Sequence, residues 1–186
     1  FDALAAAPRR VTLSVRAAGA RREAPPVGFA QAVPGTMVMF TMLILLTSGA
    51  IMLVVEREHG LLRRLASAPL SRTSLVLGKW LARMALALVQ IAFAMVLGSV
   101  LFRVDWGQSV PSVLAVLAVL LAWAGLNASL ALLLGSLART IGQTTGIGVL
   151  TSLVLAALGG CWWPIEITPP WMQNLALVLP TGWTMD

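Results

Sequence analysis

Four long stretches without a charged residue constrain this chain more than any other feature of its sequence. A transmembrane helix needs about 20 mostly apolar residues to cross a hydrocarbon core of about 30 Å. None of the stretches shows the polar stripe, recurring about every 3.6 residues, that a buried helix of a soluble protein has. We therefore predict an all-α membrane protein, a polytopic helical bundle with four transmembrane helices at about residues 36–55, 84–102, 112–137 and 142–161.

The composition agrees with a membrane protein and excludes several other classes. Hydrophobic residues make up 59% of the chain and charged residues 11%, whereas soluble domains have about 45–50% and about 25%. A disordered chain requires the opposite balance. Cys161 is the only cysteine and His59 the only histidine, so we expect neither an intrachain disulfide nor a zinc site.

The distribution of Lys and Arg predicts which ends of the helices face the cytoplasm. The polar segment 56–83 and Arg139 carry seven of these residues, whereas the opposite side has only Arg103. Because short loops rich in Lys and Arg stay in the cytoplasm, we predict 56–83 inside and 162–186 outside. Five arginines in 1–35 oppose this orientation. A segment of a large translocated domain crosses regardless of its charge, and we predict that 1–35 is the end of such an extracytoplasmic segment.

The segment 56–83 begins with the pattern of a short amphipathic helix. Three leucines recur at helical spacing beside two arginines, and a proline ends the pattern: Leu61, Leu62, Leu65, Arg63, Arg64 and Pro69. Ser71 or Thr73 can then cap the next helix. An amphipathic helix at a membrane surface docks on the bilayer or on a partner protein. An ordinary solvated loop, whose charges only set the topology, explains the same residues equally well.

Residues 162–186 are too interrupted to span the membrane. Four prolines cut this segment into short pieces, and four tryptophans accompany them: Pro164, Pro169, Pro170, Pro180, Trp162, Trp163, Trp171 and Trp183. Tryptophan suits the headgroup level, where its ring has one wet and one apolar edge. We predict an outer re-entrant or interfacial segment here, with a plain interfacial loop as the alternative. The chain then divides into 1–35, a transmembrane domain at 36–161 and the outer segment.

Polar side chains within the predicted helices are few. The amides Gln90 and Asn127 lie in the second and third of them. Helix packing and interhelical hydrogen bonds are the usual role of such amides, and contact with a transported substrate is the alternative. No acid or base lies within a predicted span, so a proton-coupled transporter would lack a proton carrier here.

Three motifs resemble the permease subunit of ABC-2 type transporters, the exporter family that includes drug-resistance permeases. Residues 56–65 read EREHGLLRRL and residues 68–72 read APLSR, and both resemble runs that follow the family's second span. Residues 33–40, VPGTMVMF, resemble the entry to that span, and the Trp/Pro pattern of 163–183 resembles the outer loop before the last span. Two positions depart from the pattern, where Thr and Phe are common: Leu62 and Trp163.

The resemblance implies the membrane subunit of an ATP-driven exporter. In such an exporter two permease units, copies of one chain or two homologous chains, work with two separate ATP-binding subunits. This chain would not be an enzyme, because its Gly78-Lys79 pair is followed by Trp80 where a P-loop has Ser or Thr. We expect no cofactor in this chain, since ATP and Mg²⁺ would be bound by the ATP-binding subunit. The implied location is the bacterial cytoplasmic (inner) membrane, with multiple spans and a last span beyond residue 186.

The resemblance also implies roles for two sets of residues. Coupling to the ATP-binding subunit, within a cytoplasmic coupling loop at 56–83, is implied for Glu56, Arg57, Gly60, Leu61, Leu62, Arg63, Arg64, Leu65 and Pro69. A role in an outer gate or interface is implied for Trp163, Pro164, Glu166, Pro169, Trp171, Pro180 and Trp183. From the residues alone, an ion- or proton-coupled secondary transporter and a non-transport membrane scaffold remain alternatives. We expect the lipid bilayer, and no nucleic acid, as a further partner.

Overall fold

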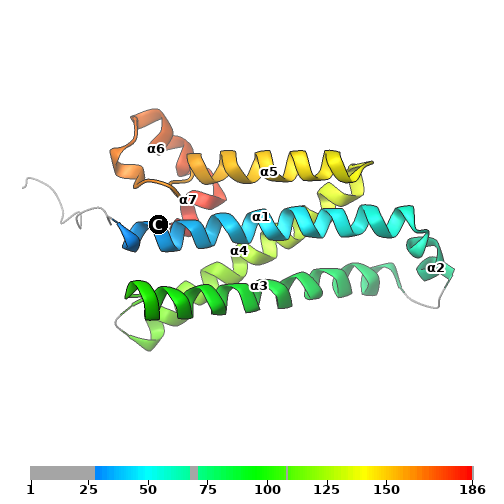
Figure 1. Cartoon of the computed structure of the whole chain (residues 1–186), viewed down its shortest axis with the longest axis horizontal. Coiled ribbons are helices and arrows are strands. Elements are labelled where there is room, and N and C mark those ends of the chain that lie inside the picture. Colours follow the sequence, from blue (N-terminus) through cyan, green and yellow to red (C-terminus); the bar gives the residue numbers. More distant parts are fainter. Residues whose placement is uncertain (1–27, 68–70, 108, 186) are drawn as a thin grey trace, which may run out of the picture.

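The computed structural model describes residues 28–67, 71–107 and 109–185, apart from the side chain of Ala66 (Figure 1). The helices in these ranges are α1 (Phe29–Glu58), α2 (Leu61–Ser67), α3 (Arg72–Phe102), α4 (Val110–Leu137), α5 (Ile141–Leu158), the 3-10 helix η2 (Ile165–Ile167), α6 (Pro170–Ala176) and α7 (Pro180–Met185). The described ranges contain no strand. Helices α1, α3, α4 and α5 are long and apolar enough to cross a membrane. The prediction of an all-α, polytopic membrane protein with four spans is confirmed.

Two of the spanning helices, α1 and α3, extend well beyond the uncharged stretches that predicted them, whereas α5 ends at Leu158, before the predicted end of the fourth span at residue 161. α1 begins at Phe29 and α3 at Arg72, both well before the corresponding apolar stretch. The physical reason is that hydropathy marks the hydrocarbon core, whereas the helix itself continues past the core wherever its backbone groups remain paired. The Ser71 hydroxyl accepts a hydrogen bond from the Ser74 backbone N–H at 3.1 Å and so begins α3. The segment 56–83 is therefore mostly helical where the structure describes it, while Pro69 lies outside the described residues.

α1 lies at the centre of the bundle (Figure 1). It packs against α3, α4 and α5. Trp123 of α4 is buried, and its Nε1 donates a hydrogen bond to the Val38 carbonyl oxygen of α1 at 3.2 Å. Further along the same two helices, a Cβ at Gly135 would lie only 2.9 Å from the Ala50 carbonyl oxygen. This close approach is what small residues allow between membrane helices. α1 therefore contacts every other spanning helix.

The two ends of the bundle carry different short elements (Figure 1). α2 follows α1 at one end, which we name the α2 end. η2, α6 and α7 gather at the opposite end, which we name the outer-segment end. Between the ends, α3 exposes most of its apolar side chains, such as Val89, Phe93 and Val100. Such a surface is costly in water and suits lipid hydrocarbon.

Candidate functional site

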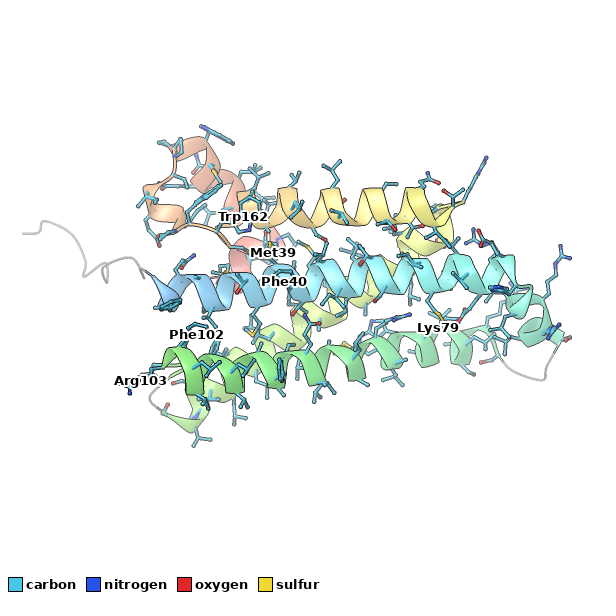
Figure 2. All side chains as sticks on the ribbon, in the orientation of Figure 1. Met39, Phe40, Lys79, Phe102, Arg103 and Trp162 are labelled. Carbon is cyan, nitrogen blue, oxygen red and sulfur yellow. The ribbon has the colours of Figure 1, made fainter. Side chains whose placement is uncertain are left out.

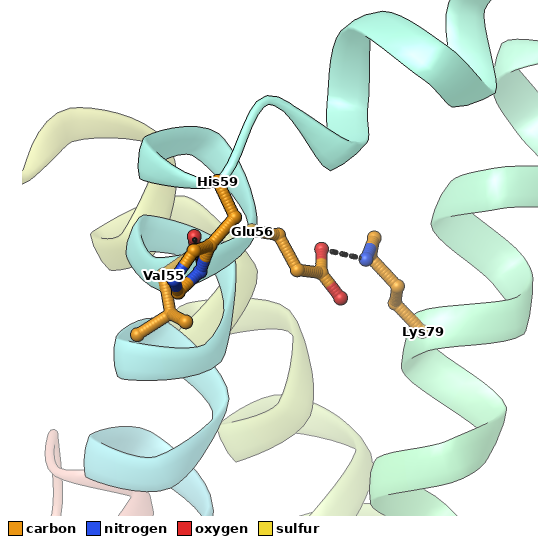
Figure 3. Close-up of polar contacts among 4 residues, drawn as sticks. All are labelled: Val55, Glu56, His59 and Lys79. Carbon is orange, nitrogen blue, oxygen red and sulfur yellow. Dashed lines mark hydrogen bonds and ion pairs between the residues drawn. The ribbon is translucent and has the colours of Figure 1, made fainter.

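The α2 end is built around a sharp turn at Gly60. The Gly60 backbone has φ +68°, in the left-handed region that glycine adopts without steric cost. Its N–H donates to the Arg57 carbonyl oxygen at 3.1 Å, which closes α1, and its own carbonyl accepts from the Arg63 N–H at 3.2 Å, which begins α2. The His59 ring also lies back on α1, with Nδ1 3.0 Å from the Val55 carbonyl oxygen (Figure 3). Gly60 thus lets two helices follow each other with only two residues between them.

α2 presents a mixed surface instead of three equally exposed leucines. It contacts α1, and Leu62 and Leu65 are half-buried. Leu61 is 39% exposed, and Arg63 and Arg64 are exposed as well. We name Leu61, Arg63 and Arg64 the α2 face. A partner that docks on α2 would meet one leucine flanked by two positive charges, while the other two leucines hold the helix in place.

Glu56, on the last turn of α1, forms an ion pair with Lys79 of α3 (Figure 3). The Glu56 side chain is only 8% exposed, and that of Lys79 is 22% exposed. A carboxylate removed from water needs a compensating charge and hydrogen bonds. Lys79 supplies both, because its Nζ also donates a hydrogen bond to the carboxylate. This contact joins the end of α1 to α3.

Arg57, the next residue, joins α1 to the end of α4. Its guanidinium donates to three backbone carbonyl oxygens there: Nη2 to Gly135 at 2.6 Å and Ser136 at 3.2 Å, and Nη1 to Ala138 at 2.9 Å. The last carbonyls of a helix lack partners within the helix, and a positive charge is favourable at that end. We name the Glu56–Lys79 pair and these three hydrogen bonds the α2-end contacts. Sequence reasoning missed them, because nothing in the local pattern indicates a partner far along the chain.

Residues of the outer segment occupy short helices at the other end of the bundle. Trp163 and Pro164 are half-buried just before η2, and Glu166 is exposed within η2. Trp171 of α6 and Trp183 of α7 are 62% and 65% exposed. Pro169 lies immediately before α6, and Pro180 is the first residue of α7. The exposed rings have the disposition that an interfacial segment requires.

The turn at 159–164, which leads into the outer segment, is held against α1 by close contacts. Gln31 of α1 donates through Nε2 to the Gly160 carbonyl oxygen at 2.7 Å. Gly35, one turn further, lies so close to the Cys161 carbonyl oxygen that a Cβ at Gly35 would overlap it. The Trp162 Nε1 donates to Met39 Sδ at 3.0 Å (Figure 2). This face of α1 therefore supports the turn at 159–164, which leads into the outer segment.

Asn127 and Gln90, two of the amides in the predicted spans, have different surroundings. Asn127 of α4 is fully buried, and its Nδ2 donates to the Trp123 carbonyl oxygen at 2.8 Å. Its Oδ1 has no hydrogen-bond partner within the described part of the chain. Gln90 of α3 is half-buried. The structure does not bring either amide to the α2 end or to the outer segment, so a role in packing or in a substrate path stays a prediction.

The Cys161 thiol is expected to react very slowly with maleimide in the folded protein. Its side chain is 1% exposed, and burial raises the pKa of the Cys161 thiol to about 12. The thiolate is the reactive form, so labelling near neutral pH should be more than about a hundredfold slower than after denaturation in SDS. Because the pKa is raised, the folded-state rate should also keep rising at pH values where an ordinary thiol has levelled off. Equal rates for folded and denatured protein would contradict the buried position of Cys161.

Comparisons with known proteins agree on one family. A family model described as "ABC-2 family transporter protein" matches residues 5–186. The linearmycin resistance permease protein LnrN of Bacillus subtilis (strain 168) is 29% identical over 153 residues. The aligned region covers 82% of this chain and 38% of that relative, so the chain spans well under half of the relative's length. No solved structure gives a significant match.

Proposed function

This chain belongs to the ABC-2 transporter family, and we propose that it is the membrane-spanning permease subunit of an ATP-driven exporter. Its spanning helices form part of the translocation path. A separate ATP-binding subunit binds ATP and Mg²⁺ and carries out hydrolysis. This chain has no catalytic role of its own, in keeping with Trp80 at the place where a P-loop has Ser or Thr.

The observation that carries this proposal is the α2 end. The short helix α2, which follows the turn at Gly60, lies at one end of the bundle and leaves the α2 face of Leu61, Arg63 and Arg64 exposed. Burying one leucine in a partner cleft contributes about 1.5–3 kcal/mol, whereas each exposed ion pair contributes about 0–1 kcal/mol. Leu61 therefore supplies most of the affinity for the ATP-binding subunit, and the two arginines set the orientation.

The orientation follows from the charges of the short connections. Lys and Arg gather at the α2 end, which supports placing this end in the cytoplasm, where ATP is present. The outer segment then lies on the opposite side, with Trp171 and Trp183 at the membrane interface and the 159–164 turn next to the path as a gate. The location is the bacterial cytoplasmic membrane. A second permease, identical or homologous, completes the transporter.

The substrate class that we propose is a toxic compound. The relative from Bacillus subtilis is a resistance permease by name, and export of a toxic compound confers resistance. The spans are apolar, and a charged molecule enters apolar surroundings at a higher cost than an apolar or amphipathic one.

Co-purification tests the assignment of ATP hydrolysis to a partner. The full-length permease is expressed with an ATP-binding subunit encoded beside its gene, and a tag on the permease is used for purification. We expect the ATP-binding subunit to co-purify and ATP hydrolysis to appear only in the complex. Hydrolysis by the purified permease without that subunit, with activity that follows the permease through size exclusion, would contradict the proposal.

A further inference from the structure

Two consecutive residues at the end of α1 contact two different neighbouring helices. Glu56 pairs with Lys79 of α3, and Arg57 donates to the last carbonyls of α4. Both residues belong to the EREHGLLRRL run, for which direct contact with the ATP-binding subunit was expected. Their side chains are instead engaged within the chain. Glu56 is buried, so it has little surface left for a partner protein.

The Arg57 contacts are specific for a guanidinium. Three acceptor oxygens from three different residues are reached by two nitrogens of one planar group. A lysine ammonium is a single point charge and cannot span the same set of acceptors. The acceptors lie at the C-terminus of α4 and at Ala138, immediately before the short turn into α5. Arg57 therefore fixes both the end of α4 and the start of the α4–α5 turn relative to α1.

We propose that Arg57, with Glu56 beside it, is a positioning residue that makes α2, α3 and the α4–α5 turn move as one unit when the ATP-binding subunit moves α2. Leu62 and Leu65 hold α2 against α1, and the α2-end contacts hold the end of α1 to α3 and to the end of α4. Together these contacts form a rigid junction. This inference rests on the proposed function, and it gives Glu56 and Arg57 a role in transmission within the permease.

A distance measurement tests the junction directly. Spin labels are placed at Ser67, the last residue of α2, and Ile141, the first residue of α5, both exposed, in full-length permease carrying C161A. Pulsed electron resonance then gives the Ser67–Ile141 distance distribution, for the permease alone and for its complex with the ATP-binding subunit. The complex is measured without nucleotide and with ATP and vanadate.

In the unsubstituted background we expect a narrow distribution that does not change with nucleotide, because both labels move with the junction. In Arg57→Gln we expect a broader distribution in the permease alone and a nucleotide-dependent shift in the complex. ATP hydrolysis and co-purification should persist, since the α2 face is unchanged. Arg57→Lys should lie between the two. Arg72→Gln, an exposed arginine at the start of α3, is the matched control and should leave the distribution unchanged.

A distribution in Arg57→Gln as narrow and as nucleotide-independent as in the unsubstituted background would overturn the inference. An equal broadening in Arg72→Gln would overturn it too, since the broadening would then follow from the loss of any positive charge at the α2 end and not from the Arg57 contacts. If Arg57→Gln does not accumulate in the membrane, Arg57→Lys replaces it in the test. A Ser67–Ile141 distribution in Arg57→Lys as narrow and as nucleotide-independent as in the unsubstituted background would then overturn the inference. The width measured in the permease alone does not depend on the ATP-binding subunit, so failure of the proposed function and failure of this inference give different results.

Discussion

A single methyl group at position 35 is expected to loosen the outer segment from the bundle. In Gly35→Ala the new Cβ would overlap the Cys161 carbonyl oxygen. Both atoms belong to backbone-anchored groups, so neither can rotate away, and α1 must separate from the 159–164 turn. Overpacking of this kind costs about 1–3 kcal/mol, which corresponds to a fall in Tm of about 2–12 °C for a chain of this size. The measurement is thermal unfolding of the purified permease in detergent.

The matched control is the same substitution at Gly78 of α3. A Cβ at Gly78 would meet nothing within 4 Å, and alanine has the higher helix propensity by about 1 kcal/mol. Gly78→Ala should therefore leave Tm unchanged or raise it slightly. In Gly35→Ala the Cys161 thiol should also react faster with maleimide, because its cover is disturbed. An unchanged Tm together with an unchanged labelling rate would show that the approach of α1 to this turn is not close.

Replacing Leu61 by glutamate is expected to abolish transport while the permease still folds. Leu61 is exposed on α2, so the change costs little within the chain. In the complex it removes an apolar contact of about 1.5–3 kcal/mol, which weakens binding of the ATP-binding subunit by about 10- to 150-fold. The buried carboxylate adds a further cost. Co-purification of the subunit and growth of cells in the presence of the exported compound measure the two effects.

Arg63→Gln is the control for Leu61→Glu. It changes a charge on the same face, and an exposed ion pair contributes only about 0–1 kcal/mol, so binding should fall by less than about sixfold. The half-buried Leu65 gives a third comparison. Leu65→Ala should lower Tm and should affect binding of the ATP-binding subunit less than Leu61→Glu does. Normal transport by Leu61→Glu, with the ATP-binding subunit still bound, would mean that the α2 face is not the docking surface.

The fold could be predicted from the sequence because its dominant signal is simple. A single long apolar stretch is stable in a bilayer as a helix, because a helix pairs its backbone N–H and C=O groups within the stretch itself. The helix ends were less predictable, since α3 begins at the Ser71 cap and not where the hydrocarbon core begins. Sequence reasoning offered Ser71 as one of two caps, and the structure confirms it.

The contacts at the α2 end could not be predicted. Lys79 lies 23 residues after Glu56 in the chain, and Gly135 lies 78 residues after Arg57. A local pattern does not indicate which charged residues will form an ion pair. Every residue has a backbone carbonyl, so the sequence also does not indicate which carbonyls will accept a side-chain hydrogen bond. The three leucines of α2 pose a similar problem. Their spacing predicts a helix, but only the packing of α2 on α1 decides that Leu61 stays exposed.

The order of synthesis gives the Arg57 contacts a further consequence. When α1 leaves the ribosome, neither the Lys79 ammonium nor the α4 carbonyls exist yet, so Glu56 and Arg57 remain hydrated at the membrane surface. Glu56 can be buried only after α3 has inserted, and Arg57 can bind only after α4 has ended at Leu137. The α2 end therefore reaches its final geometry late in biogenesis, after the third span is in place. A chain truncated within α4 would insert α1 and α3 normally and still lack the Arg57 hydrogen bonds that hold the end of α1 to the end of α4.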